Sequence, residues 1–242
     1  MKKYITPLVL SILTCVLPAL PVAHAQDNKV TVIQFPKDGW ELRREETAAI
    51  IKTINDPKST KDQLDKAIRE FDARLTESEQ IRLTPIETME LLGVFYVPKE
   101  LKNKNPDYAT LLKVITTQAT LGWYDALRYT DESGREEIAN HASFFSLAFG
   151  ANRQYFLQYM KDYPEQTAAA VKAGIQNARN MIKAKHNNYD EQWPSAYGMA
   201  RMKCVVANAK VCEHPTPRPI SEWPALLDQA DKKVSAFYSA SK

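Results

Sequence analysis

The sequence predicts an all-α protein, and three observations predict it. Glycine is scarce, with 7 residues in 242, whereas good helix formers such as Ala, Leu, Glu, Lys and Arg are plentiful. Apolar residues recur every three or four positions, the spacing of a helix that buries one face. Only residues 30–35 resemble a strand, and no second stretch offers them a partner. We therefore expect helices throughout, with a short extended N-terminal arm.

The N-terminus has the features of a secretory signal peptide. Lys2 and Lys3 precede an apolar run over residues 5–20, and residues 23–25 (Ala-His-Ala) fit a small-x-small cleavage site. The run contains prolines and is shorter than the about 20 apolar residues that a membrane helix needs. We expect cleavage after Ala25 and no integral membrane segment in the mature chain.

The mature chain is predicted to be one exported domain. With residues 1–25 as the leader, residues 26–242 form a single all-helical domain of 217 residues in the periplasm, long enough to bury a stable core. Lipidation at Cys15 is the alternative, but Thr14 is a poor residue to precede a lipidated cysteine. We favour the soluble product.

The first helices are predicted by their capping residues. Residues 41–54 carry apolar side chains at helical spacing and stop before a proline, and Ser59 or Thr60 can cap the helix that follows. At residues 84–87 (Thr-Pro-Ile-Glu), threonine is the cap, proline takes the first turn and glutamate can reach back to the cap. That helix is predicted to run to about Tyr96 and to end before Pro98.

The remaining helices follow one another through short polar loops, with a turn at residues 131–134. Their predicted ranges are 107–129, 135–149, 152–163, 164–185, 194–204 and 221–238. Eight or nine helices in this order predict a single irregular multi-helix bundle or an array of helical hairpins.

Charge and cysteine usage narrow the function classes. The net charge of +3 falls to +1 once Lys2 and Lys3 leave with the leader, so we expect no nucleic-acid partner, which would need a clustered basic excess. Cys204 and Cys212 remain, and in an oxidising compartment we expect them to form a disulfide. A zinc pair with His214 lacks a fourth ligand, so we expect no metal site, and no motif calls for a cofactor.

No catalytic motif of high specificity is present. The sequence has no Gly-x-Ser-x-Gly, no His-Glu-x-x-His, no phosphate-binding glycine loop and no dinucleotide fingerprint. Glu137 and His141, four residues apart on a predicted helix, are weak catalytic candidates, and we favour a solvent-facing pair. Asp190 and Glu191 precede Trp193, an acid beside an aromatic ring that could hold a sugar, but such neighbours are common in loops and we favour no sugar site there.

Aromatic residues are densest between residues 144 and 163. We expect the phenylalanines to be core, whereas Tyr155, Tyr159 and Tyr163 recur every four residues and are the candidate partner-binding residues. Trp123 and Tyr124 are predicted to extend that surface.

Together these features predict an exported non-catalytic protein-binding module with another protein as its partner. A periplasmic inhibitor or immunity protein that neutralises a toxin or lytic enzyme is one form of such a module. The alternatives are a small periplasmic hydrolase acting on cell-wall or lipid substrates, and a small-molecule or lipid carrier with a cavity enclosed by the aromatic hairpin. The sequence predicts no oligomeric state.

Overall fold

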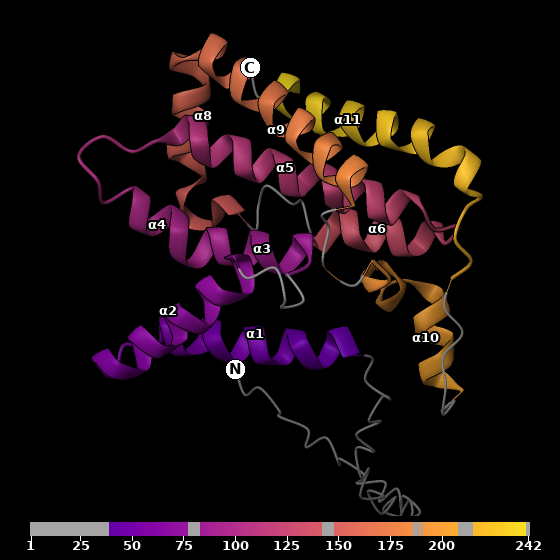
Figure 1. The fold of residues 1–242 in the computed structure, drawn as a ribbon, viewed down its shortest axis with the longest axis horizontal. Coiled ribbons are helices and arrows are strands. Elements are labelled where there is room, and N and C mark those ends of the chain that lie inside the picture. The colour runs from indigo at the N-terminus through magenta and orange to yellow at the C-terminus, as the bar shows by residue number, and fades with distance from the viewer. Residues whose placement is uncertain are drawn as a thin grey trace, which may run out of the picture. The chain divides into compact units, whose positions relative to one another are not determined.

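Helices make up nearly all of the described chain. The structure is a computed structural model that describes residues 39–76, 83–141, 148–185, 189, 191–207 and 215–240 (Figure 1). Within these ranges there is no strand, and one isolated bridge joins Tyr129 to Pro217. The predicted all-α fold is confirmed. The predicted leader over 1–25 and the arm over 30–35 lie outside the described residues.

The helices follow in an order close to the predicted one. They are α1 (Gly39–Asn55), α2 (Lys61–Thr76), α3 (Pro85–Leu91), a π-helical turn (Leu92–Tyr96), α4 (Val97–Glu100), α5 (Tyr108–Leu127), α6 (Glu132–His141), α8 (Arg153–Asp162), α9 (Pro164–Ala184), α10 (Met199–Val206) and α11 (Trp223–Ala240). Short 3₁₀ turns occupy Gly150–Asn152, Trp193–Ala196 and Ile220–Glu222.

The main core is built around α5. This helix contacts α9, α11 and α3, and side chains such as Leu112, Ile115 and Leu121 are fully buried. Because α5 is covered on several sides, it is apolar nearly all round rather than along one stripe. A second, smaller core joins α1 to α2 through residues such as Ile50 and Phe71.

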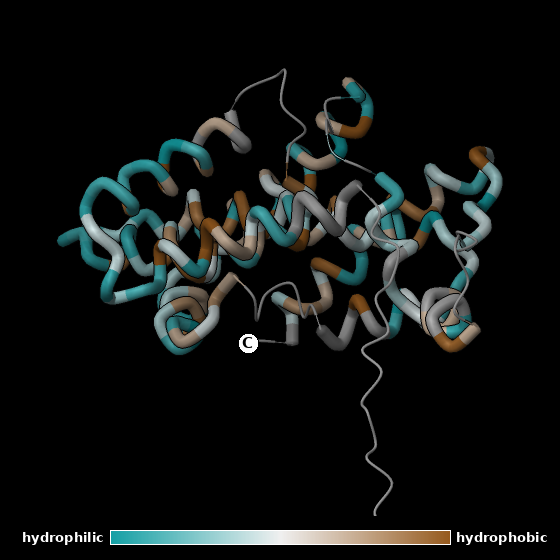
Figure 2. The backbone as a smooth tube through the Cα atoms, turned by 90° about the horizontal axis from the view of Figure 1, so that it is seen from below, coloured by the Kyte–Doolittle hydropathy of each residue, from teal (hydrophilic) through white to brown (hydrophobic). Residues whose placement is uncertain are grey.

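Hydrophobic and hydrophilic residues alternate along the helices rather than forming one long apolar run (Figure 2). In the part of the chain that the structure describes, no helix combines the length and the apolar character needed to cross a membrane.

The predicted capping box at α3 is confirmed. The backbone N–H of Thr84 donates to Glu87 Oε2 at 2.8 Å, and the N–H of Glu87 donates to Thr84 Oγ1 at 3.4 Å. Thr47 of α1 also donates its hydroxyl to Glu87 Oε1 at 3.2 Å. The buried glutamate therefore caps α3 and links it to α1.

The prediction that this helix ends before Pro98 is wrong. The chain continues through the π-helical turn into α4, and Val97 N–H bonds to the carbonyl of Leu92, five residues back. In a regular α-helix the ring of Pro98 would meet the carbonyl four residues earlier. The wider π turn relieves that clash, so the helix passes through the proline.

Asp131 caps two helices and explains two shifted boundaries. The predicted turn at 131–134 is instead the first turn of α6, because Asp131 Oδ1 accepts from the backbone amides of Ser133 at 3.0 Å and Gly134 at 3.4 Å. Asp131 Oδ2 accepts from Ala200 N at 3.4 Å, at the start of α10. The helix predicted over 194–204 therefore begins at Met199, after a residue with positive φ, Gly198.

Candidate functional site

Four tyrosines gather where α8 meets the start of α5. Tyr155 and Tyr159 lie on α8, Tyr163 directly follows its last residue, and Tyr155 and Tyr163 are 50% and 49% exposed. The ring of Tyr159 stacks on Tyr108, with centroids 4.8 Å apart and an interplanar angle of 18°. The ring of Tyr163 lies 5.0 Å from that of Tyr159. We call Tyr108, Tyr155, Tyr159 and Tyr163 the tyrosine cluster.

The tyrosine cluster rests on buried phenylalanines. Phe156 and Phe149 are 0% and 1% exposed and stack with centroids 4.4 Å apart, as expected for core residues. The ring of Tyr108 meets Phe156 edge-on at 5.5 Å. A tyrosine hydroxyl is protonated at neutral pH, and burial raises the pKa of Tyr108 and of Tyr159 further above its ordinary value. The cluster therefore offers rings held in place and neutral hydroxyl groups.

Trp123 and Tyr124 lie away from the tyrosine cluster. They occur near the C-terminal end of α5, about 22 Å along the helix axis from Tyr108. Tyr124 is 5% exposed, and the ring of Trp123 is partly buried with Lys233 Nζ 4.5 Å from its centroid. The structure does not bring this pair together with the predicted tyrosines.

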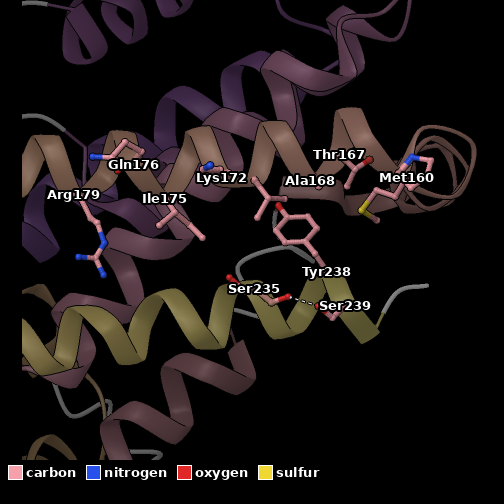
Figure 3. Close-up of a pocket in the computed structure, with 12 residues that line it drawn as sticks. Met160, Thr167, Ala168, Lys172, Ile175, Gln176, Arg179, Ser235, Tyr238 and Ser239 are labelled. Atoms are coloured by element: carbon pink, nitrogen blue, oxygen red, sulfur yellow. Dashed lines mark hydrogen bonds between the residues drawn. The ribbon is translucent and has the colours of Figure 1, made fainter.

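A pocket of about 370 Å³ lies between α9 and α11. In Figure 3 Tyr238 points from α11 toward α9, with Met160 of α8 at one end of the pocket and Arg179 at the other. Val171 and Ile175 add apolar surface from α9. We call this cavity the α9–α11 pocket. Of the aromatic segment over residues 144–163, in which the sequence predicts a cavity, only Met160 is among the residues that line this pocket in the described chain.

The pocket exists because α9 and α11 both pack on α5 and contact each other little. On one side, a Cβ at Gly174 would lie 2.6 Å from the carbonyl oxygen of Lys113, so glycine allows α9 to approach α5 closely. On the other, Tyr238 and Thr116 share a hydrogen bond of 2.7 Å between their hydroxyl groups. Helix spacing of this kind involves segments far apart in the chain, so sequence reasoning missed the pocket.

Charge is unevenly distributed around the α9–α11 pocket. Arg179 Nε donates to Asp231 at 2.7 Å, and its guanidinium also pairs with Asp228. These hydrogen bonds raise the pKa of Arg179, so its charge is fixed and matched by two carboxylates. Lys172, also on the α9 side, is exposed, and no hydrogen bond or ion pair links it to another described residue.

A buried polar network lies at the C-terminal end of α5. Asp125 is fully buried and accepts from Arg128 at 2.7 Å, from the Tyr189 hydroxyl at 2.6 Å and from Trp193 Nε1 at 3.0 Å. Arg128 also pairs with Glu191 at 2.7 Å. The network attaches the segment around residues 189–197 to α5. A charged residue within an apolar helix is the signal that could have revealed it.

The interpretation of Trp193 as a sugar-stacking ring is wrong. Its side chain is 0% exposed, and its indole nitrogen donates to Asp125. A ring enclosed in this way cannot lie against a sugar held at the surface.

The other predicted site residues fall on or beside parts of the chain whose side chains lie outside the description. Glu137 and His141 belong to α6 and Cys204 to α10, but only their backbone is described. Cys212 lies outside the described residues altogether. The catalytic pair and the disulfide therefore stay predictions.

Comparison with family models, with curated proteins and with solved structures finds no match to this chain. A function must therefore be derived from the geometry and chemistry of the tyrosine cluster and the α9–α11 pocket.

Proposed function

We propose that this chain is an exported, non-catalytic protein-binding module whose partner surface is the tyrosine cluster. One observation carries the proposal: Tyr155 and Tyr163 are half exposed, and the ring between them is already held by stacking on Tyr108. Tyrosine combines a large contact area with a polar tip and is enriched among residues that dominate binding. Because the central ring is ordered beforehand, binding would lose little side-chain entropy there.

A periplasmic inhibitor or immunity protein is the form of this module that we favour. A signal peptide, a balanced charge and a disulfide, all predicted from the sequence, suit a protein that meets a toxin or lytic enzyme outside the cytoplasm.

The test is capture of the partner by two forms of the tagged mature chain. Both are purified from the periplasm of the native host without reductant, and bound proteins are identified by mass spectrometry. The wild type should retain one stoichiometric protein. The Tyr155→Ala/Tyr163→Ala variant should bind it about 30-fold to 1,000-fold more weakly, since each such residue contributes about 1–2 kcal/mol.

The structure suggests which residues to change and which to use as a control. Tyr159 should stay, because its removal would disturb the stack on Tyr108 as well as any interface. Ile220→Ala is the control, since this residue is 74% exposed, lies in the turn before α11 and does not belong to the tyrosine cluster. Equal capture by the double variant and the wild type, with unchanged circular dichroism, would refute the proposal.

A carrier of small molecules or lipids is the second candidate, favoured by one specific observation, the α9–α11 pocket. Organic extraction of the purified protein should then release a bound ligand, and clean extracts from repeated preparations would count against it. The hydrolase alternative stays a prediction: Glu137→Ala or His141→Ala should abolish hydrolysis without loss of helix content.

A further inference from the structure

We propose that the α9–α11 pocket binds a single-chain amphiphile with an anionic head group, such as a medium-chain fatty acid, with its carboxylate beside Lys172. The proposal rests on the second candidate function, the carrier, and names the class of ligand. It concerns a different part of the molecule from the tyrosine cluster.

The shape of the pocket suits an extended chain. Its volume of about 370 Å³ lies within the range of about 300–1,000 Å³ typical of small-molecule sites. Its α9 wall runs from Pro164 to Arg179, a distance of about 22 Å along the helix axis. Because the α9–α11 pocket is long and lies between two helices, it accommodates a flexible chain better than a compact ring system.

The apolar surface is concentrated at one end. Figure 3 shows Ala168, Tyr238 and Met160 between Lys172 and the α8 end, with the hydroxyl residues Thr167 and Ser239 among them. Pro164 and Val171 of α9 add apolar surface to the pocket lining. This part extends about 12 Å along α9, which is enough for a chain of medium length. Burial of that chain would supply most of the affinity through the hydrophobic effect.

The charges fix the sign and the position of the head group. At the far end Arg179 is matched by Asp228 and Asp231, so that end carries more negative than positive charge and would repel an anion. Lys172 lines the pocket from an exposed position and makes no ion pair with another described residue, and its flexible stem can follow the ligand. A carboxylate beside Lys172 therefore gains an opposite charge while its chain extends toward Met160.

The proposal is tested with three probes that share one chain and differ in the head group. Decanoate, decanol and decyltrimethylammonium are titrated into the full mature chain by calorimetry at low salt, below the concentrations at which they aggregate. We expect decanoate to bind with one-to-one stoichiometry and about tenfold or more tightly than decyltrimethylammonium.

Two variants and one control assign the binding to this pocket. Lys172→Glu should weaken decanoate binding about tenfold and leave decanol unchanged, because only the charged head group meets that side chain. Lys183→Glu makes the same change of charge on α9 outside the pocket, about 16 Å along the helix, and should have little effect. Ala168→Trp fills the groove from an exposed position and should abolish binding of all three probes.

The failures of the two proposals are distinguishable. One outcome is that the three probes bind with equal affinity, that Lys172→Glu has no effect and that Ala168→Trp abolishes binding. This outcome would overturn the preference for an anionic head group and leave the carrier function standing. No binding of any probe would overturn the ligand class, whereas the carrier function itself would be overturned by clean organic extracts from repeated preparations. Decanoate binding that survives Ala168→Trp, in a variant with unchanged circular dichroism, would overturn the assignment to this pocket.

Discussion

A methyl group added at Gly174 should weaken the contact between α5 and α9. An ideal Cβ at this position lies 2.6 Å from the backbone oxygen of Lys113 and 2.6 Å from Thr116 Cβ. Both atoms belong to α5, and a backbone carbonyl within a helix cannot rotate away. Gly174→Ala therefore forces the two helices apart, although alanine is the better helix former.

Two opposing effects decide how much Gly174→Ala changes the free energy of unfolding. Replacing a helical glycine by alanine stabilises by about 1 kcal/mol through helix propensity. Overpacking costs about 1–3 kcal/mol, and a shift of α9 also strains the bond of 3.1 Å from the Thr117 hydroxyl to the carbonyl of Gly174, worth about 1 kcal/mol. Because the clash is with backbone, we place overpacking near its upper limit and expect a net loss of about 1–3 kcal/mol.

The assay is thermal and urea unfolding of residues 26–242, the chain without its predicted leader, followed by circular dichroism. For a chain of this size, 1 kcal/mol shifts Tm by about 2–4 °C, so Gly174→Ala should lower Tm by about 2–12 °C. Ala173→Gly is the matched control on the exposed side of α9, where propensity alone should cost about 1 kcal/mol. A Gly174→Ala variant as stable as the wild type, or more stable, would show that α5 and α9 are not in contact at this distance.

Three further changes test other contacts. Asp125→Asn should lower the free energy of urea unfolding by about 1–3 kcal/mol, because it removes the fully buried one of the two carboxylates that pair with Arg128, while Glu191 still pairs with it; a loss below 1 kcal/mol would contradict the network. Burial opposes ionisation of Asp131, but hydrogen bonds from a serine hydroxyl and three backbone amides outweigh it and lower its pKa below the ordinary 3.8. The stability that Asp131 supplies is therefore present above about pH 4 and is lost as the pH falls through the lowered pKa. The difference in Tm between the wild type and Asp131→Ala should accordingly narrow from about pH 6 to about pH 2.5. A difference in Tm that stays constant over this range would contradict the role of Asp131. Cys204 and Cys212 should resist thiol reagents until reduced, and labelling of the native protein would exclude the disulfide.

Local signals in the sequence were sufficient for the fold class and most helix starts. The Thr84 cap with Glu87 and the proline that opens α9 each specify a start through neighbours within four residues. The end predicted before Pro98 failed because a π turn, which no local rule predicts, makes room for the ring. The start of α10 was missed because Asp131, which accepts from the amide of Ala200, lies about 70 residues earlier in the chain.

The candidate sites were less predictable because they depend on contacts between distant segments. The four-residue spacing indicated a tyrosine row, but whether a ring is exposed depends on α5, where Tyr108 covers Tyr159. In the sequence Trp123 and Tyr124 looked like an extension of the tyrosine surface, but in the structure both pack toward α11. The α9–α11 pocket left no signal in the sequence because it is the space between two helices that both pack against α5.

The proposed binding surface and the buried network that stabilises the fold lie at opposite ends of α5. The tyrosine cluster and Met160 lie toward its N-terminal end, whereas the Asp125 network lies about 25 Å away at the other end. Sites this far apart without shared partners contribute nearly independently to the free energy. The rings are also held by stacking against a core helix rather than by a loop, which is how a binding surface is kept ordered before its partner arrives. A partner would therefore meet the same tyrosine surface whether or not the distant network is weakened, as long as the chain stays folded.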